Sequence, residues 1–169
     1  MKRLSALLLP PLLLGALSGC GLHPLYEGGT HGPAARKLAE IEVGPIGGQS
    51  GWLMRNALIA RLGASGESTP KYRLEVELSD QIVGLGIRSD NTVTRERRTL
   101  RARYRLVTND AAGTTLLDAS AGTDAGLDVV SSDYATLAAE QTALENLTNN
   151  LADQIVARIA VYARRNKGH

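Results

Sequence analysis

The sequence predicts an α+β fold, a two-layer sandwich in which a four-stranded, mostly antiparallel sheet carries two helices on one face. Three segments between residues 71 and 123 alternate apolar and polar side chains, as strands with one buried face do. Apolar residues recur at helical spacing before these strands, at 51–62, and over a longer stretch after them, at 133–163. A short strand ahead of the first helix completes the order β-α-β-β-β-α, which is typical of a two-layer arrangement.

The first strand is expected at 38–43, where apolar and acidic residues alternate, and the glycines and proline at 44–48 end it. Two long strands follow, from Lys71 to about Ile87 and from Thr92 to Thr108, with a turn at 89–91. After a turn at 109–113, the fourth strand runs from Thr114 to about Thr123 and completes a meander. The buried face of the strand from Lys71 is expected to hold Tyr72, Leu74, Val76, Leu78 and Ile82.

Two helices are expected to cover that face. For the first, at 51–62, Ser50 is the expected N-cap and the buried stripe consists of Trp52, Met54 or Arg55, Leu58, Ile59 and Leu62. The second begins near Ser131, Ser132 or Asp133 and would measure roughly 45 Å over 133–163. Its stripe consists of Leu137, Leu144, Leu147, Leu151, Ile155, Ile159 and Tyr162.

The N-terminus reads as a secretion signal. Lys2 and Arg3 precede an apolar run at 4–17 that is too short for a comfortable membrane span, which needs about 20 residues. Leu17-Ser18-Gly19-Cys20 matches the lipobox of bacterial lipoproteins; the alternative is an ordinary cleaved signal with a chance cysteine. We therefore expect residues 1–19 to be removed and Cys20 to carry diacylglycerol and an N-acyl chain such as palmitate. Gly21, in place of an aspartate, favours the outer membrane.

Charge and residue types exclude several function classes. The formal charge of +2 comes from Lys2 and Arg3, so the 150 residues left of the 169 are formally neutral and do not favour a nucleic acid as partner. The histidines are His23, His31 and His169, outside the expected packed elements, so no metal site or catalytic base is apparent. We expect a lipidated tether at 20–36, one domain at 37–163, a basic tail at 164–169, no catalysis and no cofactor.

Arginines dominate one expected strand face. Arg95, Arg97, Arg101, Arg103 and Arg105 all lie opposite the apolar residues of the strand from Thr92, because side chains alternate. Three interpretations are open: a solvated face paired with acids such as Glu75 and Glu77, contact with a partner, or binding of anionic phosphates. The apolar hairpin end around Leu85 either inserts into a partner or is covered by the far end of the long helix.

Several stretches in order resemble one family. They are Cys20-Gly21-Leu22-His23-Pro24-Leu25-Tyr26, the helix segment 51–58, Thr94-Arg95 with Arg103-Tyr104-Arg105-Leu106, and 132–135 with 151–155. Together they are similar to the alphaproteobacterial lipopolysaccharide-assembly lipoproteins of the LptE type. Leu22 departs from the aromatic residue that is frequent there.

The resemblance implies a non-enzymatic function. Proteins of the LptE type sit partly inside the LptD-type outer-membrane β-barrel, as plug and assembly partner, while lipopolysaccharide is inserted into the outer leaflet. It implies a lipid-anchored protein at the periplasmic face and in the barrel lumen. In such a protein the five arginines of the strand face and Leu85 of the hairpin end are our candidate lipopolysaccharide or partner contacts. The alternative is an auxiliary lipoprotein of another envelope lipid-transport system or a periplasmic scaffold.

Overall fold

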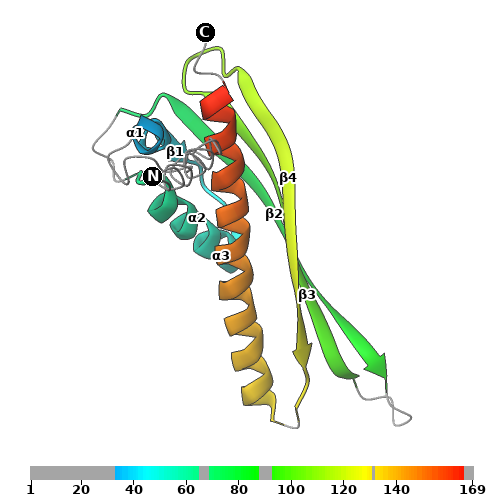
Figure 1. Cartoon of the computed structure of the whole chain (residues 1–169). Coiled ribbons are helices and arrows are strands. Elements are labelled where there is room, and N and C mark those ends of the chain that lie inside the picture. The colour runs from blue at the N-terminus through cyan, green and yellow to red at the C-terminus, as the bar shows by residue number, and fades with distance from the viewer. Residues whose placement is uncertain (1–32, 65–68, 88–92, 131, 166–169) are drawn as a thin grey trace, which may run out of the picture.

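A computed structural model describes residues 33–64, 69–87, 93–130 and 132–165. One layer is a four-stranded sheet and the other consists of three helices (Figure 1). The strands follow one another across the sheet in the order β1-β2-β3-β4, with β1 parallel to β2 and the remaining pairs antiparallel. The expected α+β fold with a mostly antiparallel sheet is therefore confirmed, with one helix more than expected.

The three long strands form the expected meander. They are β2 (Tyr72–Ile87), β3 (Val93–Thr108) and β4 (Thr115–Asp128). Strand β4 runs five residues beyond the expected end, because it follows β3 as far as the pair of Asp128 with Arg95. Its last residues do alternate, but Ala125 and Leu127 are the two apolar side chains among them, so the pattern is too weak to mark the end of the strand.

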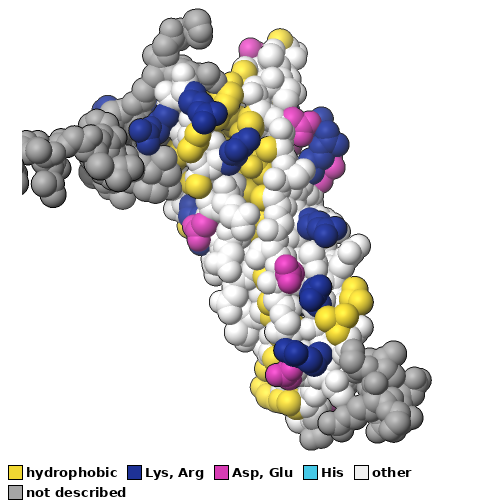
Figure 2. Space-filling view, turned by 45° about the vertical axis from the view of Figure 1, so that its right-hand side comes forward, with side chains coloured by type: hydrophobic (Ala, Val, Ile, Leu, Met, Phe, Trp, Pro, Cys, Tyr) yellow, Lys and Arg dark blue, Asp and Glu magenta, His cyan; other side chains and the backbone are white. Residues whose placement is uncertain are grey.

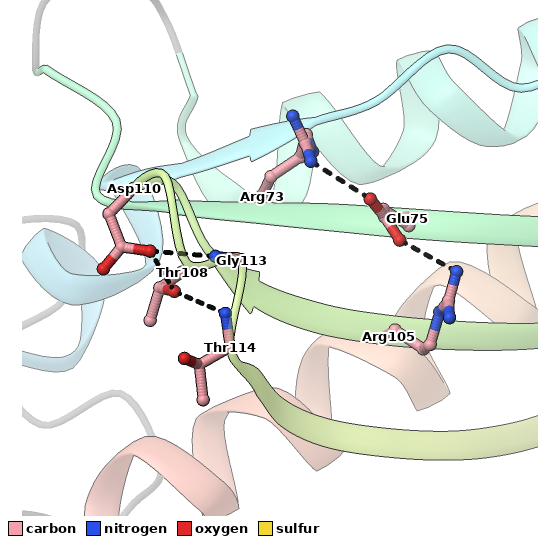
Figure 3. Close-up of polar contacts among 7 residues, drawn as sticks. All are labelled: Arg73, Glu75, Arg105, Thr108, Asp110, Gly113 and Thr114. Atoms are coloured by element: carbon pink, nitrogen blue, oxygen red, sulfur yellow. Dashed lines mark hydrogen bonds and ion pairs between the residues drawn. The ribbon is translucent and has the colours of Figure 1, made fainter.

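The turn between β3 and β4 is stabilised by Asp110 (Figure 3). Its carboxylate accepts hydrogen bonds from the Thr108 hydroxyl and from the backbone N–H groups of Ala112 and Gly113. These donors lower the pKa of Asp110, the Thr108 hydroxyl most of all. Gly113 has φ +56°, a left-handed conformation that a glycine adopts without a steric penalty.

The start of the domain differs from expectation. Helix α1 (Pro33–Ala39) replaces the last residues of the expected tether and the first of the expected strand. Pro33 suits a first helical position, since its fixed φ is helical and its missing N–H needs no partner. Strand β1 is only Ile41–Val43, because α1 ends at Ala39 and Gly44-Pro45 follows.

Helix α2 (Gly48–Leu62) begins before Ser50, so the expected cap is wrong: Gly47 is the N-cap, without a side-chain hydrogen bond. The buried stripe consists of Gly51, Met54, Leu58 and Leu62. Trp52, expected in that stripe, is 64% exposed, because about 200° of helix rotation separates it from Met54. Position 51 requires a glycine, because a larger side chain there would collide with Ile46.

Helix α3 (Asp133–Arg165) is the longest element, about 50 Å, and takes in two residues of the expected tail. It packs along β3 and β4 and beside α2. The expected stripe is buried at Leu144, Leu147, Leu151, Ile155 and Ile159, which pack against Leu100, Tyr104 and Leu106 of β3. Leu137 is instead exposed. Of the expected caps, Ser132 is the one observed, since its hydroxyl oxygen accepts from the N–H of Ala135.

Several predicted features lie outside the described residues: the expected signal peptide, Cys20, the expected tether up to residue 32, the turn at 89–91, Ser131 and the end of the tail at 166–169. No helix among the residues that are described combines the length and the apolar character needed to cross a membrane.

Candidate functional site

The five expected arginines lie on the sheet face that points away from the helices. We call Arg95, Arg97, Arg101, Arg103 and Arg105 the arginine face; all five are exposed. They occupy alternate positions of β3, the central strand of the meander, while Leu100, Ala102, Tyr104 and Leu106 are buried beneath α3. In Figure 2, basic and acidic side chains follow one another down the right-hand side of the molecule.

Four of the five arginines are paired with acids on the flanking strands. Arg103 contacts Asp118 of β4 with two nitrogens, at 2.9 and 3.3 Å. Arg95 pairs with Asp128 at 3.1 Å and Arg97 with Asp124 at 3.8 Å. Three of these carboxylates belong to β4, so the face is cross-paired mainly with β4.

The fourth pair lies toward β2. Arg105 Nη2 donates to Glu75 Oε2 at 3.1 Å, and Arg73 donates to the other oxygen of the same carboxylate at 3.2 Å (Figure 3). The hydrogen bonds that Arg103 donates to Asp118 lower the pKa of the Asp118 carboxyl and raise the pKa of the Arg103 guanidinium. Because the arginines and the aspartates are exposed and Glu75 is only partly buried, these pairs set the charge pattern of the face more than the stability of the fold.

Arg101 differs from its neighbours. It makes no ion pair with any residue that the structure describes. Its cross-strand neighbours are Ser79 on β2 and Gly122 on β4, which carry no charge. It lines a shallow hollow of about 440 Å³ together with residues of all three long strands, among them Glu77, Ser79, Arg103 and Ser120. Arg101 is therefore the member of the arginine face with a guanidinium left for an external anion.

Sequence reasoning missed a sixth arginine of β3. Arg98 faces the helix layer and is only 9% exposed. It donates two hydrogen bonds to the Asp80 carboxylate, at 2.9 and 2.6 Å, and one to the backbone carbonyl of Glu140 in α3, at 2.9 Å. The hydrogen bond to Asp80 raises the pKa of Arg98. The sequence did hold a signal for this pair: Arg98 and Asp80 both stand at positions where the alternation of their strands calls for an apolar residue.

Beyond Arg98 the two layers expose apolar side chains. Tyr134 is 84% exposed and Leu85 38%; we call the set Ile82, Val83, Leu85, Val130, Tyr134 and Leu137 the distal end. In Figure 1 this end holds the β2–β3 hairpin and the start of α3. Val83 and Leu85 share the face of the arginines, so α3 cannot cover them, and the interpretation that the helix covers the tip is wrong for these residues.

The described residues contain no group of three or more His, Cys, Asp or Glu side chains that could hold a metal ion. The three histidines lie outside those residues. What the arrangement offers is therefore two surfaces for binding: a charged strand face and an apolar end.

The sequence model of the family described as LptE, lipopolysaccharide-assembly, matches residues 38–159. The chain belongs to the LptE family. The match contains α2, the whole sheet and most of α3, and it confirms the expected family; the motif at 20–26 lies outside the matched residues. The LptE family is one of non-enzymatic lipopolysaccharide-assembly lipoproteins.

Solved structures share the LptE fold of this chain. A Caulobacter crescentus protein described as a lipoprotein is 23% identical, with a TM-score of 0.69 over 82% of this chain and 100% of that one. A minor lipoprotein from Acinetobacter baumannii is 17% identical, with a TM-score of 0.57 over 74% and 91%. Rare lipoprotein B from Shewanella oneidensis is 10% identical, with a TM-score of 0.55 over 76% and 98%. No curated protein matches the sequence significantly.

We expect the Arg98–Asp80 contact to stabilise the LptE domain. Asp80→Ala leaves a largely buried guanidinium without its carboxylate and should lower the free energy of unfolding by about 2–3 kcal/mol. Urea denaturation followed by circular dichroism measures this.

Two further variants isolate the pairing. The double variant Asp80→Leu with Arg98→Met should regain most of the loss, because apolar residues then fill the same space. Arg97→Ala, one position along but exposed, should change the free energy by under about 0.5 kcal/mol. An Asp80→Ala protein as stable as the unaltered chain would contradict the assigned role.

Proposed function

We propose that this LptE-family chain is a lipid-anchored outer-membrane protein that assembles with an LptD-type β-barrel and plugs it while lipopolysaccharide is inserted into the outer leaflet. Family membership supports the assembly role. The observation that carries the barrel contact is the exposed distal end, where apolar side chains of β2 and α3 stand uncovered. An apolar patch of this kind on a folded domain marks an interaction site.

The lipid anchor is part of the proposal. The lipobox supports modification of Cys20, and the thiol is the nucleophile that takes the diacylglycerol. Each buried methylene contributes about 0.8 kcal/mol, and one acyl chain binds only marginally, so several chains are needed for a stable anchor. With this anchor the chain would act without catalysis or cofactor, at the periplasmic face and in the barrel lumen.

Direct contact with lipopolysaccharide, where it occurs, is assigned to Arg101. The other four arginines already have carboxylate partners, so an external phosphate would have to compete with them. The Arg101 guanidinium has none among the described residues and lies beside a hollow that is open to solvent. A guanidinium fork binds phosphate oxygens in pairs, which suits the phosphates of lipid A.

Cys20→Ala should abolish incorporation of a clickable palmitate analogue, because the chain has no other cysteine to acylate. In-gel fluorescence of the tagged protein from labelled cells gives the readout. Ser18→Ala keeps a small residue in the lipobox and should label normally. Labelling of the Cys20→Ala protein would show that the anchor lies elsewhere.

Val83→Glu together with Leu85→Glu should reduce co-purification of a very large outer-membrane barrel at least tenfold, because burying two carboxylates in an apolar contact is costly. Gln81→Glu is the matched control, since it adds a carboxylate on the same exposed face of β2. If the Gln81→Glu protein loses as much barrel as the double variant, the distal end is not the contact with the barrel. An unaltered chain that purifies without any barrel would favour an auxiliary lipoprotein of another transport system.

Arg101→Gln should weaken lipopolysaccharide binding about tenfold, since one charge-assisted contact with phosphate contributes about 1.5 kcal/mol or more. The binding should also weaken with salt. Arg73→Gln serves as the control, because Arg73 lies on the same sheet face but is held by Glu75. Salt-sensitive binding that survives Arg101→Glu combined with Arg103→Glu would exclude the arginine face as the phosphate site.

A further inference from the structure

Four exposed cations lie at the end of the molecule opposite the distal end. Arg36 and Lys37 belong to the last turn of α1, and Arg164 and Arg165 to the last turn of α3. Helix α1 packs against α3 and lies beside its C-terminal part in Figure 1. We call these four residues the basic end. None of them makes an ion pair with a residue that the structure describes.

Of the acids near this end, Glu40 is paired with a cation, whereas Asp110 is held by uncharged donors and keeps its negative charge. Glu40 accepts a hydrogen bond from Lys71 at 2.9 Å, and Asp110 accepts those of its own turn. Arg164 and Arg165 line a shallow hollow of about 330 Å³ with Val161. In Figure 2, basic side chains gather at the upper left of the molecule with no acidic side chain between them. None of the four cations is paired with a described carboxylate, so the basic end keeps a net positive charge.

Helix dipoles account for only part of this arrangement. Cations are favourable at the carbonyl end of any helix, which explains a basic last turn in α1 or in α3 taken singly. It does not explain why two helices more than 90 residues apart in the chain bring their basic ends together. Their convergence makes one surface that attracts an anionic partner larger than a single ion.

We propose that the basic end rests on the anionic phospholipid headgroups of the membrane that holds the anchor. This inference depends on lipidation at Cys20, part of the proposed function. From Cys20 to Pro33 the chain advances 13 residues, at most about 45 Å when fully extended. Helix α1 is the first described element, so the basic end is the part of the domain nearest the anchor along the chain.

The distal end is too far from the basic end to feel the charge of the membrane surface. The distal end lies about 50 Å away along α3, many times the screening length of about 8 Å at physiological salt. Lysine and arginine are attracted to anionic leaflets only within about one screening length of the surface. Headgroup contact at the basic end therefore does not involve the distal end, which stays available for the proposed contact with the barrel.

Vesicle binding tests the contact without the acyl chains. The chain from residue 20, carrying Cys20→Ser, should co-sediment with vesicles of phosphatidylcholine and phosphatidylglycerol, and much less with phosphatidylcholine alone. Arg36→Gln, Lys37→Gln, Arg164→Gln and Arg165→Gln together should weaken that binding at least about tenfold. Circular dichroism checks that these exposed substitutions leave the fold unchanged.

A second quadruple variant has the same change in net charge. The changes are Asn56→Asp, Ala60→Glu, Asn146→Asp and Asn150→Asp, all at exposed positions of α2 and α3 that are not part of the basic end. It should bind vesicles within about twofold of the unaltered chain. Equal loss in both variants, or no loss in the first, would overturn the proposal.

The proposed function is judged by a separate measurement. Lipidated protein with the four glutamine substitutions should still co-purify with the barrel, because the distal end is intact. If the unaltered lipidated chain brings down no barrel, the proposed function fails while the vesicle result stands. If vesicle binding is lost only on changing the arginine face, the anion-binding surface is that face and the basic end is excluded.

Discussion

The packing of α3 along β3 and β4 decides the character of both faces of the sheet. Because strand side chains alternate, burying Leu100, Ala102 and Tyr104 beneath the helix sends the odd-numbered residues of β3 to the opposite face. Five of those residues are arginines, and four find carboxylates on the strands beside them. Arg98 marks the limit of the packing, since it joins both strands of the hairpin to α3 where the apolar contact ends.

The regular parts of the fold were predictable because long periodic segments bury one side. Strands β2 and β3 and the helix α3 agree with the expected ranges to within about two residues. Short elements carry no such signal, so the seven-residue α1 and the three-residue β1 were not separated. Trp52 was misplaced because an apolar residue at helical spacing need not face the core. Here the side of α2 that carries Gly51 packs against Ile46, and Trp52 is exposed.

The arginine face was predicted as a surface but not as a set of pairs. Alternation places five arginines on one side of β3 and the aspartates at 118, 124 and 128 on one side of β4. Which arginine meets which carboxylate depends on the register of β3 with β4 and β2, which alternation does not give. The difference between Arg101 and its neighbours likewise arises from register, which sets Ser79 and Gly122 beside it. In the sequence, Arg98 and Asp80 only interrupt the apolar faces of β3 and β2. The structure shows that the two side chains pair with each other there.

The shortness of β1 has a consequence for solubility and biogenesis. Strand β1 pairs only with Tyr72–Leu74, so no described strand borders the outer edge of β2 from Glu75 onward, and β4 borders the other side of the sheet unpaired. Long open edges are templates for pairing with other chains, and rows of charge along a sheet are a common safeguard against it. The aspartates at 118, 124 and 128 place such charges along the open edge strand β4, which disfavours its pairing with a second copy of the chain.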